Sequence, residues 1–317
     1  MKILVTGSTG LVGKALVAAL AKDGHSVCRL VRPGTNVRDD AGGFNVAWNP
    51  ATGELGGAAV GADAVVNLAG ASIAEGRWTE KRKADLRSSR VDVTRVLIEA
   101  LGKMNVKPTV LISASAIGYY GNRGDEILDE GSAAGEGFLA GIAKEWEAEA
   151  SRAEVWRTRV VLARFGIILA REGGALPKMV TPFKLGLGGR LGSGKQWMSW
   201  VALEDVVGIL KLCLERTPIQ GAVNFAPISG ALNVVSPQPV TNAEFTKELA
   251  RALHRPVIFP APAFGLRLAV GWEMADALLL ASQRVVPKKL QQIEYAFRHP
   301  VLNSALNAIL AKQNSLI

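Results

Sequence analysis

Short apolar runs alternate with longer amphipathic stretches through the first half of the chain. Strands are predicted within five apolar runs, at 2–6, 25–31, 63–70, 109–116 and 155–169. Helices are predicted where apolar residues recur at helical spacing, at 11–23, 88–104 and 138–152. Strands that alternate with helices form a parallel sheet that is covered on both faces. The pattern therefore predicts an α/β fold, a Rossmann-type doubly wound parallel sheet.

The pattern changes after residue 170, where Gly, Pro and Trp become frequent. The segment 171–200 predicts a loop-dominated lid or substrate region. We therefore expect a sheet domain over 1–170, to which 200–235 return. A smaller substrate-side lobe is expected from 171–199 together with 236–317.

The later part of the chain is predicted to be largely helical. Its clearest elements are a helix at 203–216, a strand at 222–226 and a second helix at 241–255. The second helix has Thr241 or Asn242 as its N-cap, and Glu244 can complete a capping box.

Composition and charge narrow the function classes. The net charge is +9, but the basic residues are scattered, so nucleic-acid binding is not expected as the main function. A highly anionic bound cofactor accounts for some of this charge. No uncharged apolar run reaches about 18 residues and no secretory signal is seen, so no membrane span is expected. The three histidines are dispersed, and no metal site is expected.

The two cysteines, Cys28 and Cys213, lie far apart in apolar runs. They lack metal-ligand spacing and are predicted to be buried free thiols. Free thiols fit a reducing compartment, which for this chain means the cytoplasm.

A glycine pattern follows the first predicted strand, in VTGSTGLVGKAL from Val5 onward. Gly7, Gly10 and Gly13 lie where the strand gives way to a helix. In this context the first glycine permits a tight turn, the second lets the backbone approach a pyrophosphate, and the third allows close helix–strand packing. The helix N-terminus also favours an anion. The loop therefore predicts a dinucleotide site.

A nucleoside triphosphate site fits this sequence less well. A Walker A loop has four residues between its first Gly and a Gly-Lys pair, followed by Ser or Thr. Five residues separate Gly7 from Gly13, and Ala15 follows Lys14. The segment GGRLGSGKQ has the required spacing but places Gln196 where the magnesium-binding hydroxyl belongs. An ATPase or GTPase is therefore not expected.

Arg32 follows the second predicted strand. Many dinucleotide-binding domains have an Asp or Glu there, which binds the ribose 2′-hydroxyl. An arginine suits a 2′-phosphate instead, through charge-assisted hydrogen bonds. The alternative is an ordinary surface arginine at a strand end. We interpret Arg32 as favouring NADP(H) over NAD(H).

Further motifs give the chain a family resemblance. They are AWNP (47–50), NLAG (67–70), SRVDVT (89–94), SASAIGYYG (113–121), FLAGIAKEWE (138–147), GGALPKMVTPFKLGLGGRLGSGKQWMSWV (173–201), PVTNAEF (239–245) and SQRVVPKKL (282–290). With the glycine loop, they resemble the extended short-chain dehydrogenase/reductases. More narrowly they resemble the atypical "epimerase family protein" branch, NAD-dependent epimerase/dehydratase-like with a C-terminal domain of unknown function. The motifs span nearly the whole chain.

The resemblance implies a Rossmann domain that carries NADP and a smaller lobe that closes over a substrate cleft. It also implies a set of cofactor contacts, with Asp85 and Ile168 as weaker candidates. The main contacts are Gly7, Thr9, Gly10, Leu11, Val12, Gly13, Arg32, Leu68, Ala69 and Arg90.

The usual Tyr-x-x-x-Lys chemistry of this superfamily is not implied. There the phenol is the acid/base, and the lysine assists it and holds the nicotinamide ribose. Lys144 occupies the lysine position, but Ala140 stands four residues earlier and has no proton to give. Ser115 matches the superfamily's hydroxyl position. We hypothesise that Ser115 orients a substrate hydroxyl or carbonyl while Tyr119 or Tyr120 supplies the proton; the alternative is that the tyrosines serve packing.

The substrate side is expected in the long glycine-rich motif. By similarity to sugar-nucleotide enzymes, Arg190 and Lys195 would face substrate phosphates, with Trp197 as a stacking wall. The alternative is a flexible lid with ordinary surface charges.

Two function classes stay open. One is an NADP-dependent oxidoreductase or epimerase-like enzyme whose substrate is a small molecule, such as a nucleotide sugar or a carbonyl compound. The other is a catalytically inactive NADP-binding sensor or interaction protein. Homodimer formation is also left open.

Overall fold

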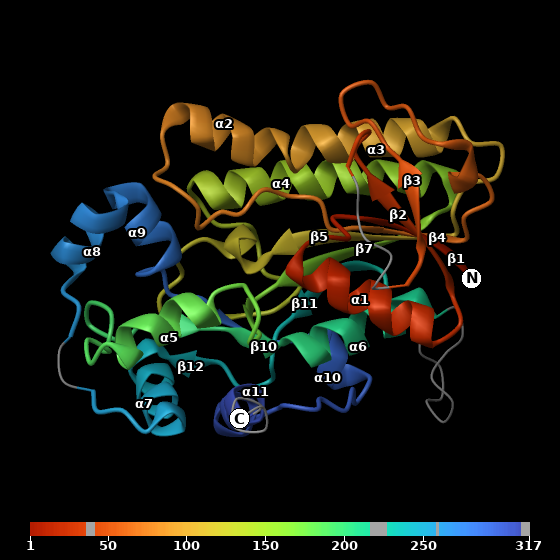
Figure 1. The fold of residues 1–317 in the computed structure, drawn as a ribbon. Coiled ribbons are helices and arrows are strands. Elements are labelled where there is room, and N and C mark those ends of the chain that lie inside the picture. The colour runs from red at the N-terminus through yellow and green to blue at the C-terminus, as the bar shows by residue number, and fades with distance from the viewer. Residues whose placement is uncertain (36–41, 216–226, 258–259, 312–317) are drawn as a thin grey trace.

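A seven-stranded parallel sheet forms the centre of the computed structural model, which describes residues 1–35, 42–215, 227–257 and 260–311 (Figure 1). The strand order is β11-β7-β5-β4-β1-β2-β3. The strands are β1 (Lys2–Thr6), β2 (Ser26–Val31), β3 (Phe44–Ala47), β4 (Ala64–Asn67), β5 (Val110–Ala116), β7 (Arg159–Phe165) and β11 (Gly230–Val234). The predicted Rossmann-type α/β fold is confirmed.

Helices cover both faces of this sheet, as Figure 1 shows. One face carries α1 (Leu11–Lys22) and α6 (Leu203–Leu214). The other carries α2 (Glu80–Ser88), α3 (Val91–Gly102) and α4 (Phe138–Ser151). Strand alternation divides the core between the two faces: Ile3 and Val5 pack toward α1, whereas Leu4 packs toward α3.

The predicted strand at 155–169 is two strands rather than one. β7 ends at Phe165, and β8 (Ile167–Leu169) pairs instead with β10 (Trp200–Ala202). The break falls at Gly166, where a Cβ would lie 2.5 Å from the Ser199 carbonyl oxygen. Only a residue without a side chain permits this close approach. The chain leaves the central sheet at this point.

The segment 171–200 contains a helix where a loop-dominated region is predicted. α5 (Leu176–Lys184) begins with a proline in its first turn, where the missing N–H costs nothing. Its buried residues Leu176, Val180 and Phe183 recur at helical spacing and pack in one cluster with α7 (Asn242–Leu253). Glycines flank this apolar pattern, and Pro177 and Pro182 lie within it, so the sequence indicates a loop.

Short elements complete the structure. The strands are β6 (Ile127–Leu128), β9 (Trp197–Met198), β12 (Val240–Thr241) and β13 (Arg284–Val285). The helices are α8 (Ala263–Val270), α9 (Trp272–Leu278), α10 (Lys288–Gln292) and α11 (Leu302–Ala311), with 3₁₀ turns η2 (Gly57–Ala59), η3 (Ile117–Tyr120) and η4 (Arg152–Trp156). Within the described ranges, no helix combines the length and apolarity needed to cross a bilayer.

The predicted capping box of α7 is confirmed. Thr241 is the N-cap: its hydroxyl accepts from the Glu244 backbone N–H at 3.2 Å, and its own N–H donates to the Glu244 carboxylate at 2.7 Å. Such a cap stabilises a helix by about 1 kcal/mol. The strand predicted at 222–226 lies outside the described residues; the seventh strand of the sheet is β11, farther along the chain.

Candidate functional site

The glycine loop lies at the carboxyl end of β1 and opens α1. Gly7 has a φ of +63°, and a Cβ there would come within 2.5 Å of the Leu68 carbonyl oxygen. A Cβ on Gly13 would lie 2.2 Å from the Gly7 carbonyl oxygen. The loop is therefore folded tightly against both the loop after β4 and its own helix, as a dinucleotide turn requires. At the α1 N-cap, Gly10 is exposed and brings no side chain between the helix N-terminus and an anion.

Ser8 is the residue of this loop that the sequence reasoning missed. Its hydroxyl oxygen is buried and has no hydrogen-bond partner among the described residues. A buried polar atom without a partner is costly, so it points to a ligand that supplies one. Thr9, the predicted cofactor contact next to it, is exposed. Together with the α1 N-terminus, Ser8 fits the pyrophosphate of a dinucleotide.

Polar side chains in the sheet hold the loop after β4 beside the glycine loop. The Thr6 hydroxyl donates to the Asn67 amide oxygen at 2.7 Å and accepts from the Leu68 and Ala69 N–H groups at 3.0 and 3.2 Å. Asn67 in turn donates to the Thr94 hydroxyl on α3 at 2.8 Å. The predicted contacts Leu68 and Ala69 are thus brought to Gly7 by residues that the sequence reasoning did not select.

Arg90 lies against the same loop. Its guanidinium donates to the carbonyl oxygens of Ala71, at 2.7 Å, and Leu86, at 3.1 Å, and lies 5.5 Å from the ring centroid of Trp146. These partners are neutral, and burial lowers the pKa of Arg90 to about 10. A half-buried cation whose hydrogen-bond partners are all neutral, and which has a second cation, Arg82, nearby, favours an anion in its surroundings; this agrees with its predicted place in the cofactor site.

The other predicted cofactor residues lie in different surroundings. Val12, Leu68 and Ile168 pack against the same core cluster, and the Leu11 side chain lies beside Gly174. Arg32 is exposed directly after the carboxyl end of β2. Asp85 is exposed on α2.

A buried polar row crosses the carboxyl ends of three neighbouring strands. Ser115, Arg164 and Asn233 are partners in register on β5, β7 and β11. The Ser115 hydroxyl donates to the Glu147 carboxylate on α4 at 2.6 Å. Arg164 binds both oxygens of the same carboxylate, each at 2.8 Å. The geometry is that of a bidentate charge-assisted pair, which is strong and directional.

Tyr120 closes this row. Its hydroxyl accepts from Arg164 at 2.9 Å and donates to the Asn233 amide oxygen at 2.7 Å. The side chain is fully buried, and burial raises the pKa of Tyr120 to about 12. Burial by itself would lower the pKa of Arg164, but the bonds to Glu147 raise it above its ordinary value. Ser115 and Tyr120 therefore both give their protons to protein acceptors in this structure.

Tyr119 and Lys144 are placed differently. The Tyr119 ring is half-buried and lies over the Arg164 guanidinium, 3.5 Å from its central carbon, with Tyr120 edge-on at 5.4 Å. Lys144 is exposed on α4, one turn after Ala140, which is only 1% exposed. The structure thus brings Ser115, Tyr119 and Tyr120 together around Arg164, while Lys144 is exposed on α4, three residues before Glu147.

Comparison with known proteins agrees with this geometry. The sequence model of the NAD dependent epimerase/dehydratase family matches residues 3–226, and that of a domain of unknown function, DUF1731, matches residues 261–309. The chain belongs to the NAD-dependent epimerase/dehydratase family. It is 42% identical to an epimerase family protein of Mycobacterium leprae over 306 residues, which cover 96% of this chain and 94% of that one.

Solved structures extend the likeness. Human epimerase family protein SDR39U1, crystallised with NADPH, shares 33% identity with a TM-score of 0.85, over 98% of this chain and 99% of that one. A nucleoside-diphosphate sugar epimerase from Corynebacterium glutamicum shares 35% identity with a TM-score of 0.74, over 98% of this chain and 58% of that one. As a member of an NAD(P)-dependent epimerase family, the chain has the dinucleotide-binding fold that its glycine loop indicates.

The predicted substrate-side residues of this family member lie in and beside one loop. Arg190 and Lys195 are exposed. The Trp197 indole N–H donates to Asp125 at 2.8 Å, and Arg284 lies over the ring, 4.2 Å from its centroid. Gln196 stands where a triphosphate-binding loop would need a hydroxyl residue. Its side-chain amide donates to the carbonyl oxygens of Leu191, in the same loop, and Leu279, near the end of α9, and so fixes the loop.

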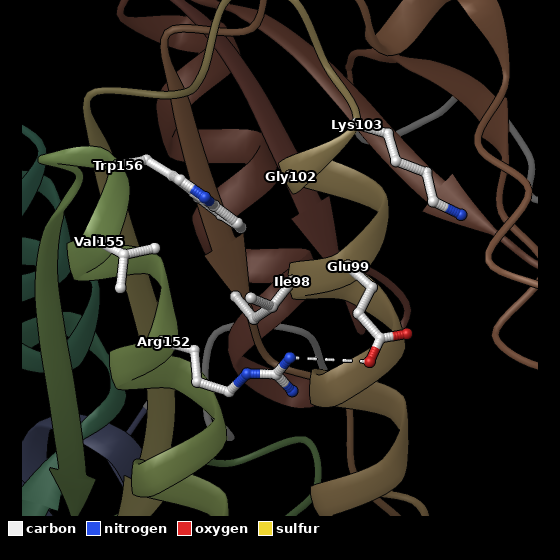
Figure 2. Close-up of a pocket in the computed structure, with 7 residues that line it drawn as sticks. All are labelled: Ile98, Glu99, Gly102, Lys103, Arg152, Val155 and Trp156. Carbon is white, nitrogen blue, oxygen red and sulfur yellow. Dashed lines mark ion pairs between the residues drawn. The ribbon is translucent and has the colours of Figure 1, made fainter.

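A groove of about 640 Å³ lies elsewhere on this epimerase-family fold (Figure 2). Its walls come from the C-terminal end of α3 and from η4. A helix that follows a parallel strand runs back along it, so these walls lie at the amino ends of the strands, the edge opposite the glycine loop. Its lining residues are Ile98, Glu99, Gly102, Lys103, Arg152, Val155 and Trp156. The groove therefore has no part in the cofactor site.

Proposed function

We propose that this chain is an NADP(H)-dependent oxidoreductase or epimerase-like enzyme that acts on a small hydroxyl or carbonyl compound. The observation that carries the proposal is the position of the buried polar row, in which Ser115 and Arg164 both bind Glu147. The row lies at the carboxyl edge of the same sheet that carries the glycine loop. In doubly wound sheets, ligands bind at this edge. A cofactor bound to the loop and a substrate held near Tyr119 would meet there.

Arg32 supports NADP(H) rather than NAD(H). It is exposed at the position where an acidic residue would bind the 2′-hydroxyl, and the human relative was crystallised with NADPH. The variant Arg32→Asp should weaken NADPH binding by about tenfold or more and leave NADH binding equal or stronger, because a charge-assisted bond contributes about 1.5–3 kcal/mol. The measurement is a pair of fluorescence titrations. An unchanged ratio of the two dissociation constants would show that Arg32 does not select the cofactor.

The substrate is placed in the second lobe, which we assign to 171–199 and 236–317. Arg190 and Lys195 supply two exposed cations, which suit the phosphates of a nucleotide sugar. The relative described as a nucleoside-diphosphate sugar epimerase supports this class. Trp197 serves as a stacking wall for the substrate, and the Arg284 guanidinium covers one face of its ring. The buried free thiols of Cys28 and Cys213 support a reducing, cytoplasmic setting.

A second candidate is a catalytically inactive NADP-binding sensor or interaction protein. Two observations favour it: Ala140 stands where the superfamily tyrosine would be, and the Ser115 hydroxyl already donates to Glu147.

Hydride transfer separates the two functions. NADPH and NADP⁺ are each incubated with a panel of carbonyl compounds, alcohols and nucleotide sugars, and absorbance at the nicotinamide band is followed. An epimerisation that regenerates the cofactor is followed by product analysis. If the chain is an enzyme, it should turn over at least one of these compounds, and Tyr119→Phe or Ser115→Ala should lower the turnover rate below that of the wild type. If the chain binds NADPH but turns over none of the compounds, the result supports the inactive NADP-binding sensor or interaction protein.

A further inference from the structure

A short strand from the domain of unknown function crosses the site region. β13 lies within the DUF1731 match and pairs in parallel with β6. On its other side, the Gln283 N–H donates to the Trp197 carbonyl oxygen at 3.1 Å. The buried Ser199 hydroxyl donates to the Gln283 carbonyl oxygen and accepts from the Val285 N–H, both at 2.8 Å. The strand is thus held between β6 on one side and residues 197–199 on the other.

The Gln283 side chain reaches from this strand to the turn that carries both tyrosines. Its amide nitrogen donates to the carbonyl oxygens of Ile117, at 3.1 Å, and Gly121, at 3.0 Å. These two carbonyls bracket Tyr119 and Tyr120. A primary amide has two N–H donors, and both are used here. A single 3₁₀ turn has poor hydrogen-bond geometry of its own, so an outside donor at each end fixes its shape.

We propose that Gln283 is a positioning residue, through which the DUF1731 strand holds the tyrosine turn (residues 117–121) and keeps Tyr119 over Arg164. This assigns the domain of unknown function a role in completing the site. The catalytic consequence rests on the proposed function. The hold on the turn does not, because it follows from the hydrogen bonds alone.

Different anchors hold the two ends of the site. The glycine loop is fixed by β1 and the loop after β4. The tyrosine turn is held in its middle by the buried Tyr120 hydroxyl and by the Gly135 N–H, which donates to the Tyr119 carbonyl oxygen at 2.9 Å. Its two ends are held by Gln283, more than 160 positions later in the chain. Arg164 and Glu147 are fixed in β7 and α4. Loss of Gln283 should therefore loosen the ends of the turn and leave the glycine loop and the buried ion pair in place.

The test uses the full chain with Gln283→Glu and Gln283→Met. The first replaces both donors with acceptors facing carbonyl oxygens, and the second removes the donors without adding a charge. Gln291→Glu is the matched control, because Gln291 is exposed on α10 in the same domain. Hydrogen exchange is measured by mass spectrometry on peptides that cover 117–121 and 7–16, and NADPH affinity is titrated.

We expect exchange in the tyrosine turn to rise about thirtyfold in both Gln283 variants, given about 1 kcal/mol for each of the two lost bonds. Exchange in the glycine loop and the NADPH dissociation constant should match those of Gln291→Glu. Unchanged exchange in the turn overturns the proposal, and so does an equal rise in both peptides, which indicates general destabilisation.

Kinetics supply the second readout. With a substrate that the wild type turns over, the Gln283 variants should lose kcat while KM for NADPH stays constant. Full kcat in a variant with a loosened turn overturns the positioning role. If the wild type turns over no compound, the proposed function fails, and hydrogen exchange still decides whether Gln283 holds the turn.

Discussion

Removal of the Arg164 guanidinium should expose how the buried row is stabilised. Arg164 is 4% exposed and makes two bonds to Glu147 and one to Tyr120. In Arg164→Met the new side chain fills most of the space but donates nothing. The Glu147 carboxylate then stays buried with the Ser115 hydroxyl as its remaining partner within this row.

The expected magnitude follows from that arrangement. Breaking a buried ion pair by removing one partner costs about 3–5 kcal/mol. For the 317 residues of this chain each kcal/mol lowers Tm by about 1.5 °C, so Arg164→Met should melt about 5–7 °C below the wild type. The double variant Glu147→Leu/Arg164→Met removes both charges. Its main remaining cost is the lost acceptor of Ser115, about 1–3 kcal/mol.

Urea unfolding followed by tryptophan fluorescence measures these differences. The control is Arg152→Met, which removes an arginine that pairs with Glu149 at the surface and is 49% exposed. Its cost should stay below about 1 kcal/mol. If the double variant is as unstable as Arg164→Met, an uncompensated buried charge is not the cause and the reasoning is refuted.

Two further outcomes follow from single contacts. In Gly13→Ala the new Cβ would lie 2.2 Å from the Gly7 carbonyl oxygen, so the loop must shift and NADPH affinity should fall by about tenfold or more; equal titration curves would contradict this. The hydrogen bond from Lys288 lowers the pKa of Asp129, so this carboxylate contributes stability above its unfolded pKa of about 3.9 that is lost as the pH falls through the lower folded value. Asp129→Asn should therefore be less stable than the wild type near pH 6, by at most about 1 kcal/mol, and equal to it near pH 2. A constant difference across this range of urea titrations would exclude the link.

Local patterns in the sequence were enough to predict five of the seven strands of the sheet and the cofactor loop, whereas β3 and β11 were not predicted. Apolar runs mark the strands because both faces of a parallel sheet are buried, and the spacing of Gly7, Gly10 and Gly13 is itself the geometry of the turn. The same patterns failed at Gly166, where the end of β7 depends on the approach of Ser199 from another segment. No pattern within 155–169 records that contact.

The end of the site that carries the tyrosine turn depends on contacts between distant segments. Ser115 and Tyr120 could be selected by their chain positions, but their partners could not, because strand register and the placement of α4 bring Glu147 and Asn233 to them. Ser8 was overlooked for a similar reason. Which hydroxyl of a Ser-Thr pair turns inward is decided by the fold of the loop, and both residue types fit the motif.

The position of β11 has a consequence for synthesis. This edge strand pairs with β7, yet it leaves the ribosome only after the whole segment 171–199 has been made. Until then β7, with its run of Val160, Val161, Leu162 and Ala163, is the outermost strand of the nascent sheet. An apolar strand with unpaired backbone groups readily pairs with other chains. The growing polypeptide is therefore most vulnerable to aggregation between the completion of β7 and the arrival of residue 234, and a chaperone that binds nascent chains should act in that interval.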